Sequence, residues 1–125
     1  MLDVDTADVE KTTVCIARGE LDALSASTFR AAFPRCLGRP SLLIDLTGVR
    51  FIDSAGLTVL VGLVRRARDQ AGEVAVCARG GLRRVLLEAG LGGVVSLSET
   101  TETALAKLRA AARPTQAVWP SKSIR

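Results

Sequence analysis

Residues 41–46, SLLIDL, form an apolar run of strand length, and this run limits the folds that the chain can adopt. A strand of this kind is typical of the centre of a sheet, where both faces are covered. Residues 12–19, TTVCIARG, and residues 73–78, EVAVCA, also have strand character. Segments with helical spacing of apolar residues separate these runs. The alternation predicts an α/β fold, with an at least partly parallel sheet that is layered with helices.

Apolar residues recur with helical spacing in several parts of the chain. These segments are residues 24–37, 54–70, 81–91 and 98–111. The stripe of the first segment is expected to consist of Leu24, Phe29, Ala32 and Phe33. Ser25 and Ser98 are the predicted N-caps of the first and last helices, and Pro34 is expected to kink or shorten the first. Residues 2–5 predict a weak edge strand and residues 93–97, GVVSL, a short strand.

The chain has 125 residues, a length that fits one domain. Its formal net charge is +4, but the basic residues form no concentrated stripe and only 3% of residues are aromatic, which argues against nucleic-acid binding. No histidine is present, and the three cysteines, Cys15, Cys36 and Cys77, form no CxxC pair. We therefore expect no metal and no cofactor, and we expect the cysteines to be small buried residues.

No stretch of the sequence is both long and apolar enough to span a bilayer. Arg50 and Asp53 interrupt one candidate, and Arg65 and Arg66 end the next. The acidic N-terminus lacks a signal-peptide pattern. We expect a cytoplasmic protein that binds neither a membrane nor a nucleic acid.

Ser54 lies between Asp53 and an Ala–Gly pair, where a β-like stretch gives way to a helix. The simplest interpretation is a cap, because serine and aspartate are common N-cap residues. Gly56 fits this interpretation less well, because glycine weakens a helix interior by roughly 1 kcal/mol relative to alanine. Small residues at positions 55 and 56 suit a place where another group approaches the backbone closely.

Two catalytic interpretations of Ser54 fail on chemistry. A nucleophilic serine needs a base, most often histidine, and the chain has none. The sequence also lacks the G-x-S-x-G elbow and the glycine-rich phosphate-binding loop. A third interpretation is that Ser54 is modified. A phosphate at a helix N-terminus meets free backbone N–H groups, and it adds about −1.5 to −2 charges beside Asp53. Such a charge is expected to make a binding surface repulsive.

Three blocks of the sequence resemble the STAS domain family and, within it, the bacterial anti-sigma factor antagonists. The blocks are ARGELDALSASTFR at residues 17–30, LLIDLTGVRFIDSAGLTVLVGLVRRARDQAG at residues 42–72 and LRRVLLEAGLGGVVSLSETTETAL at residues 82–105. The resemblance implies a STAS fold over residues 1–112, with a mixed, mostly parallel sheet of about four to five strands and about four helices layered on it. Residues 113–125, which include Trp119, have no counterpart and are expected to be a flexible tail.

The resemblance also implies a mechanism. Unphosphorylated members of this group bind an anti-sigma factor that is also an ATP-dependent serine kinase, and a sigma factor is released for transcription. The kinase phosphorylates the antagonist, which dissociates, and a phosphatase resets it. The phosphorylated serine of these proteins matches Ser54. The residues that match the partner-binding surface are Asp22, Asp53, Ala55, Gly56, Leu57 and Thr58.

Two positions depart from the pattern of the family. Ala55 stands where many members have a second hydroxyl, and Thr58 stands where glycine is common. Neither change removes the acceptor.

We expect a protein without enzymatic activity, monomeric or weakly dimeric. The alternatives are a STAS adaptor subunit that docks on a membrane transporter or lipid-export ATPase, and a sensory or nucleotide-binding STAS module. The intact acceptor serine favours the switch over the adaptor.

Overall fold

The computed structural model describes the backbone of residues 1–70 and 72–122 and the side chains of residues 1–70 and 72–111. Within this range, strands and helices alternate after an initial strand pair. The elements are β1 Leu2–Val9, β2 Thr12–Leu21, α1 Ala26–Ala31, α2 Phe33–Cys36, β3 Ser41–Ile52, α3 Ser54–Asp69, β4 Glu73–Cys77, α4 Gly80–Glu88, the 3₁₀ helix η1 Leu91–Gly93, β5 Ser96–Ser98 and α5 Thr101–Lys122.

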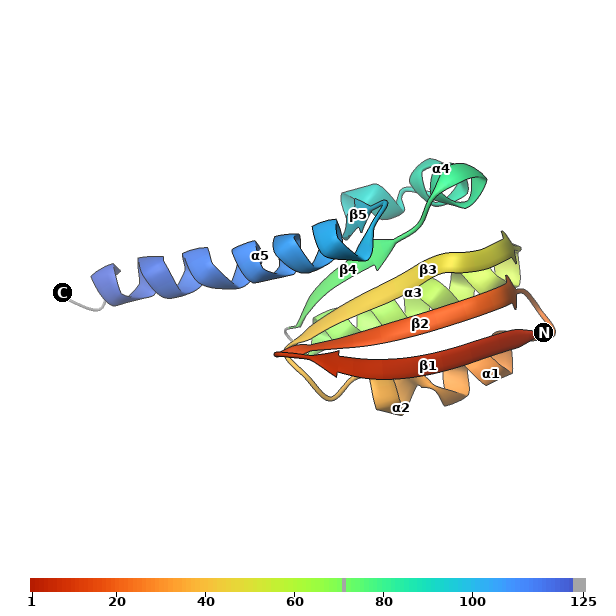
Figure 1. Ribbon diagram of the computed structural model, residues 1–125, viewed down its shortest axis with the longest axis horizontal. Helices are drawn as coiled ribbons and strands as arrows, with labels where there is room; N and C mark the ends of the chain where they lie inside the picture. Colours follow the sequence, from red (N-terminus) through yellow and green to blue (C-terminus); the bar gives the residue numbers. More distant parts are fainter. Residues whose placement is uncertain (71, 123–125) are drawn as a thin grey trace.

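The strands form one sheet in the order β1-β2-β3-β4-β5 (Figure 1). β1 is an edge strand that pairs antiparallel with β2, and the other neighbouring strands pair parallel. The apolar run SLLIDL lies in β3 at the centre, where Leu43 and Ile44 are fully buried on opposite faces of the sheet. These observations confirm the predicted α/β fold with a mixed, mostly parallel sheet and the predicted edge strand.

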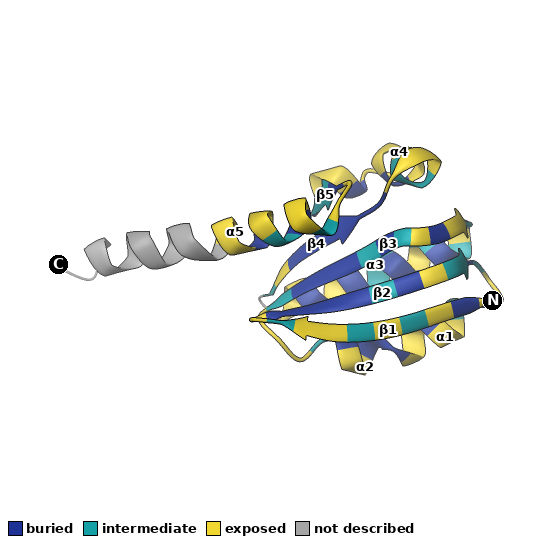
Figure 2. Cartoon of the chain, viewed as in Figure 1, coloured by how far each residue is buried: buried dark blue, intermediate teal, exposed yellow. Residues whose placement is uncertain are grey.

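Helices cover both faces of the sheet. The larger group of buried side chains lies between the sheet and the helices α1 to α4, and it includes Phe29, Leu60 and Leu86. A smaller group lies under α5, where Ala104 and Leu108 pack on the sheet. Buried residues are concentrated in β2, β3 and β4, whereas β1 carries many exposed ones (Figure 2). The covering explains why the central strands are apolar on both faces.

The last strand begins later than the sequence predicts. Residues 91–93 form η1, and the N–H groups of Val94 and Val95 both donate to the Leu91 carbonyl, at 3.0 and 3.1 Å. These bonds close a turn and keep this stretch out of the sheet, so the predicted strand over residues 93–97 is wrong at its start. Pairing with β4 begins only at Ser96.

Ser98 is not the N-cap of the last helix. It is the final residue of β5, and its buried hydroxyl has no hydrogen-bond partner among the described side chains. The hydroxyl of Thr100 caps α5 instead, because it accepts the N–H of Thr103 at 3.1 Å. The predicted cap is therefore two residues too early.

The segment around the first helix also differs from the prediction. Leu24 does not join the apolar stripe: it lies before α1 and its exposed fraction is 92%. Ser25 occupies the N-cap position, but its hydroxyl makes no bond to the helix. The helix breaks at Ala32, and Pro34 lies in the first turn of α2, which confirms the predicted shortening.

The predicted tail over residues 113–125 stays a prediction. The α5 backbone continues as a helix to Lys122, but the described side chains end at Ala111 and so do not include Trp119. The boundary at residue 112 is likewise untested. None of the described helices is long and apolar enough to cross a membrane.

The start of α3 rests against the end of β2. A Cβ atom on Gly56 would lie 1.9 Å from the Leu21 carbonyl oxygen, which is far inside van der Waals contact. The same carbonyl accepts the N–H of Asp53 at 3.3 Å. The sequence predicts a close backbone approach here, and the approaching group is the Leu21 peptide of the same chain. Glycine is therefore required at position 56 by packing.

We predict that Gly56→Ala lowers the free energy of unfolding by about 2–3 kcal/mol, as expected for a side chain forced into a packed site. Gly62, in the same helix, is the matched control, because its added Cβ would meet only a Phe33 ring carbon at 4.0 Å. Gly62→Ala is expected to stabilise the protein by up to about 1 kcal/mol through helix propensity. Urea unfolding of both variants measures the difference. Equal stabilities would contradict the packing role of Gly56.

A second prediction concerns the apolar stripe of α3. Leu60 is fully buried against the sheet, whereas Leu57 is only partly buried. Leu60→Ala should cost about 2–5 kcal/mol because it leaves a cavity, and Leu57→Ala should cost clearly less. Urea unfolding of the two variants under the same conditions measures the difference in their free energies of unfolding. A loss at Leu57 as large as that at Leu60 would contradict this assignment.

Candidate functional site

Ser54 lies at the edge of the sheet where the parallel strands β2 and β3 end. β3 ends at Ile52, Asp53 is the N-cap residue, and Ser54 is the first residue of α3. The Ser54 residue is exposed, as the sequence predicts, and its hydroxyl makes no hydrogen bond within the described part of the chain. In α/β folds this edge is where sites gather. The hydroxyl is therefore free to meet another molecule.

Asp53 is the side chain that caps α3. Its Oδ1 atom accepts the N–H of Gly56 at 2.8 Å, and its Oδ2 atom accepts the N–H of Ala23 at 3.2 Å. The cap interpretation of the Asp–Ser pair is thus correct for Asp53 and wrong for Ser54. Because the Asp53 carboxylate caps α3, the Ser54 hydroxyl is not needed to cap this helix.

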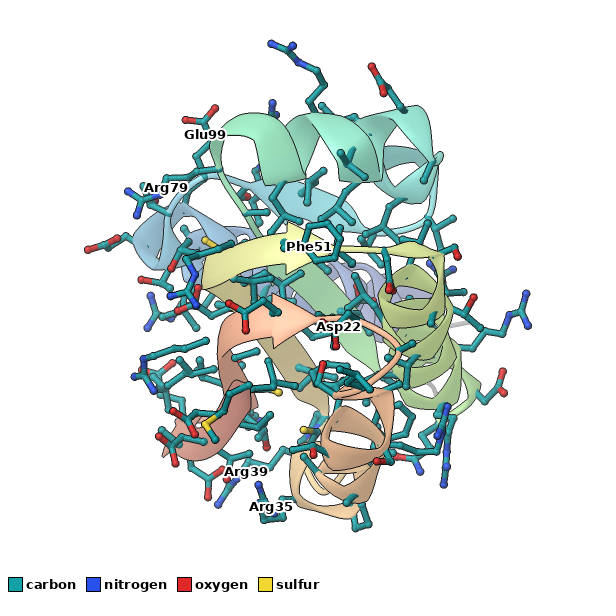
Figure 3. All side chains as sticks on the ribbon, turned by 90° about the vertical axis from the view of Figure 1, so that its right-hand side faces the viewer. Asp22, Arg35, Arg39, Phe51, Arg79 and Glu99 are labelled. Carbon is teal, nitrogen blue, oxygen red and sulfur yellow. The ribbon has the colours of Figure 1, made fainter. Side chains whose placement is uncertain are left out.

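Asp22 shapes the loop that follows β2. Its Oδ1 atom accepts the N–H groups of Leu24 and Ser25, at 3.1 and 3.0 Å. The Ser25 hydroxyl accepts the N–H of Asp22 at 2.9 Å and donates to the Glu20 carbonyl at 2.7 Å. The loop meets the start of α3 through the bond from Ala23 to Asp53. The structure therefore brings the Asp22 loop to the end of the sheet that carries Asp53 and Ser54, as the sequence predicts. Figure 3 shows Asp22 at this end of the molecule.

The other predicted partner-binding residues differ in accessibility. Ala55 and Leu57 are half-buried, and Gly56 is buried against β2. Thr58 is exposed one turn after Ser54, and its hydroxyl donates to the Ser54 carbonyl at 2.8 Å. Ser54 and Thr58 thus form the exposed ridge of the first turns of α3. Any effect of Gly56 on binding would be indirect, through the position of this turn.

Three carboxylates, those of Glu20, Asp22 and Asp53, lie near the end of β2 and the start of α3. Glu20 pairs with Arg50 and with the Met1 ammonium group, and these hydrogen bonds lower the pKa of Glu20 to about 2. The Glu20 carboxylate is therefore charged at neutral pH, and cations balance it. Within the described side chains, Asp22 and Asp53 make no ion pair and bond only to N–H and hydroxyl groups. Their negative charges remain available to repel a further anion.

Two exposed apolar side chains lie at this end of the sheet that the sequence pattern does not reveal. Phe51, near the end of β3, has an exposed fraction of 51%, and Leu24, in the loop shaped by Asp22, has one of 92%. Periodicity gives no signal for either, because Phe51 continues a strand pattern and Leu24 fits a helical stripe. Both lie at the edge that carries Ser54.

The described residues contain no group of side chains that could hold a metal ion. All three cysteines are buried, as the sequence predicts. Burial raises the pKa of the Cys77 thiol to about 11, so that this thiol is protonated and unreactive at neutral pH. The chemistry that this edge offers is an exposed hydroxyl beside aspartates, which suits a group that is modified by a partner.

Three comparisons place the chain among known proteins. An anti-sigma factor antagonist from Mycobacterium paratuberculosis is 28% identical, with 87% of this chain and 95% of that chain covered and a TM-score of 0.80. The phosphorylated form of the Bacillus cell fate determinant SpoIIAA has the same fold, at 22% identity, 84% and 98% coverage and a TM-score of 0.64. A sulfate transporter family protein from Wolinella succinogenes also shares it, at 12% identity, 83% and 89% coverage and a TM-score of 0.72.

The family model of the STAS domain matches residues 3–104. This range contains all of the sheet except Leu2, the first turn of α3 with Ser54, and the start of α5. The match covers most of the chain, and the structural neighbours include proteins described as anti-sigma factor antagonists. The fold and this match agree, and the chain belongs to the STAS domain family.

Proposed function

We propose that the protein is an anti-sigma factor antagonist controlled by phosphorylation of Ser54. In its unphosphorylated form it binds an anti-sigma factor that is a serine kinase, and a sigma factor is thereby released. Phosphorylation of Ser54 ends the binding, and a phosphatase restores it. The protein acts in the cytoplasm and has no enzymatic activity of its own.

The free hydroxyl of Ser54 is the observation that carries this proposal. It is exposed at the first position of α3, and Asp53 performs the capping for it. A kinase can therefore reach the hydroxyl without disturbing a bond that the fold needs. The N-terminus of a helix also tolerates a phosphate, because its first N–H groups and the helix dipole favour negative charge.

The surrounding charges support a repulsive switch. A phosphate at Ser54 would add about −1.5 to −2 charges at neutral pH beside the carboxylates of Asp53 and Asp22, which bond only to N–H and hydroxyl groups within the described part of the chain. A partner that fits an uncharged hydroxyl would have to desolvate this added charge. Such a mismatch at an interface can cost several kcal/mol.

The relatives agree with this function. The Mycobacterium paratuberculosis protein is named an anti-sigma factor antagonist, and the Bacillus protein has a phosphorylated form. A second candidate is an adaptor subunit on a membrane transporter, which the likeness to the Wolinella sulfate transporter family protein favours at the level of the fold. An adaptor would use the same face of α3 but would not depend on the charge of residue 54.

We predict that Ser54→Ala keeps full affinity for the cognate anti-sigma kinase and changes the free energy of unfolding by less than about 0.5 kcal/mol, as expected for an exposed residue without a structural bond. Ser54→Asp should bind at least about tenfold more weakly, which corresponds to about 1.4 kcal/mol. The phosphorylated protein, with its larger charge, should bind more weakly still. Isothermal titration calorimetry with ADP present and salt held constant measures the dissociation constants.

Gln70→Glu is the matched control for this series. It adds the same single charge just beyond the opposite end of α3, at an exposed position, and should leave the affinity unchanged. Equal affinities of the wild-type, Ser54→Asp and phosphorylated proteins would refute the charge switch. That result would leave the adaptor as the better explanation of the fold.

A further inference from the structure

Leu24 is the most exposed large apolar side chain in the described part of the chain apart from Met1, with an exposed fraction of 92%. Single apolar residues on a surface are ordinary and need no explanation by themselves. Leu24 differs from such residues in two respects. The loop that carries it is held by hydrogen bonds, and this loop lies beside the start of α3.

The loop around Leu24 is held by hydrogen bonds at every residue. The N–H of Asp22 donates to the Ser25 hydroxyl at 2.9 Å, and the N–H of Ala23 donates to Asp53 at 3.2 Å. The N–H groups of Leu24 and Ser25 both donate to the Asp22 carboxylate. The leucine therefore projects from a fixed backbone. Because the backbone of the loop is already ordered, binding through Leu24 would cost little additional backbone entropy.

The position of Leu24 links it to Ser54. One carboxylate, that of Asp53, holds both the Leu24 loop, through Ala23, and the first turn of α3, through Gly56. Leu24 directly follows Ala23, whose N–H bonds to this carboxylate, and Ser54 directly follows Asp53 itself. A protein that approaches the Ser54 hydroxyl therefore meets Leu24 at the same edge. Asp22, which orders the loop, lies at this edge together with Phe51 (Figure 3).

We propose that Leu24 is the apolar anchor of the partner-binding surface and enters an apolar pocket on the kinase that phosphorylates Ser54. This inference rests on the proposed function and adds a residue and a role to it. Ser54 carries the charge that ends binding, whereas Leu24 supplies apolar contact area in the unphosphorylated complex. The Asp22 and Asp53 carboxylates hold the anchor and the acceptor in a constant relative position.

The experiment compares Leu24→Ala with Leu87→Ala, the same change at an apolar residue of α4 that is 43% exposed. Leu24→Ala should raise the dissociation constant for the kinase about tenfold, and Leu87→Ala should leave it unchanged. In phosphorylation assays Leu24→Ala should raise the KM by a similar factor with kcat unchanged, because the side chain touches the partner and not the reacting atoms. Leu24→Met, which conserves the volume, should restore most of the affinity.

The thermal unfolding midpoint of Leu24→Ala should equal that of the wild type, since the side chain makes no packing contact that the fold needs. Wild-type affinity in Leu24→Ala would overturn the anchor and leave the Ser54 switch intact. A fall in kcat without a change in KM would also overturn it. A wild-type protein that binds no anti-sigma kinase would overturn the proposed function and the anchor together.

Discussion

The carboxylate of Asp53 holds together the part of the molecule on which the proposed function depends. It accepts one N–H from the first turn of α3 and one from the loop after β2. Gly56 allows this arrangement, because only a residue without a side chain fits against the Leu21 carbonyl. The first turn of α3, the end of β2 and the Asp22 loop are thereby fixed as one unit. Ser54 and Leu24 project from this unit into solvent.

The residues that build this end of the sheet differ from those that are available to a partner. Asp22, Asp53 and Gly56 are used in hydrogen bonding and packing within the chain. The hydroxyl of Ser54 has no such bond within the described part of the chain, so its modification would change the charge of the surface and leave the supporting bonds in place. A regulatory charge placed on this exposed position would therefore act on binding far more than on stability.

The sequence predicts most of the fold because its signals are local. The apolar run in β3 and the helical spacing of apolar residues over residues 54–70 depend on period and burial. Both are confirmed, and α3 buries Leu60 and Val64 in the core. The start of β5 could not be predicted from the sequence, because Val94 and Val95, which fit a strand pattern, close a turn on Leu91 instead. The N-cap of α5 depends on where β5 ends: Ser98 is still part of the strand, and the hydroxyl of Thr100 caps the helix.

The candidate site was also predicted in part. The pairing of Asp22 with the Ser54 turn came from a resemblance, and the structure supplies its physical basis in the bond from Ala23 to Asp53. The spacing of apolar residues predicts that Leu24 belongs to the stripe of the first helix. Asp22 instead binds the N–H groups of Leu24 and Ser25 and delays the helix until Ala26. A long-range contact and a side-chain competitor for backbone groups are both invisible to periodicity.

The most direct test of the account is to map phosphate incorporation after the protein has been incubated with its cognate anti-sigma kinase and Mg-ATP. Intact-mass measurement and peptide mapping should find a single phosphate per chain, on Ser54, together with loss of the complex in size-exclusion chromatography. Incorporation on Thr58 or on another residue in place of Ser54, or a complex that persists after Ser54 is fully phosphorylated, would contradict it.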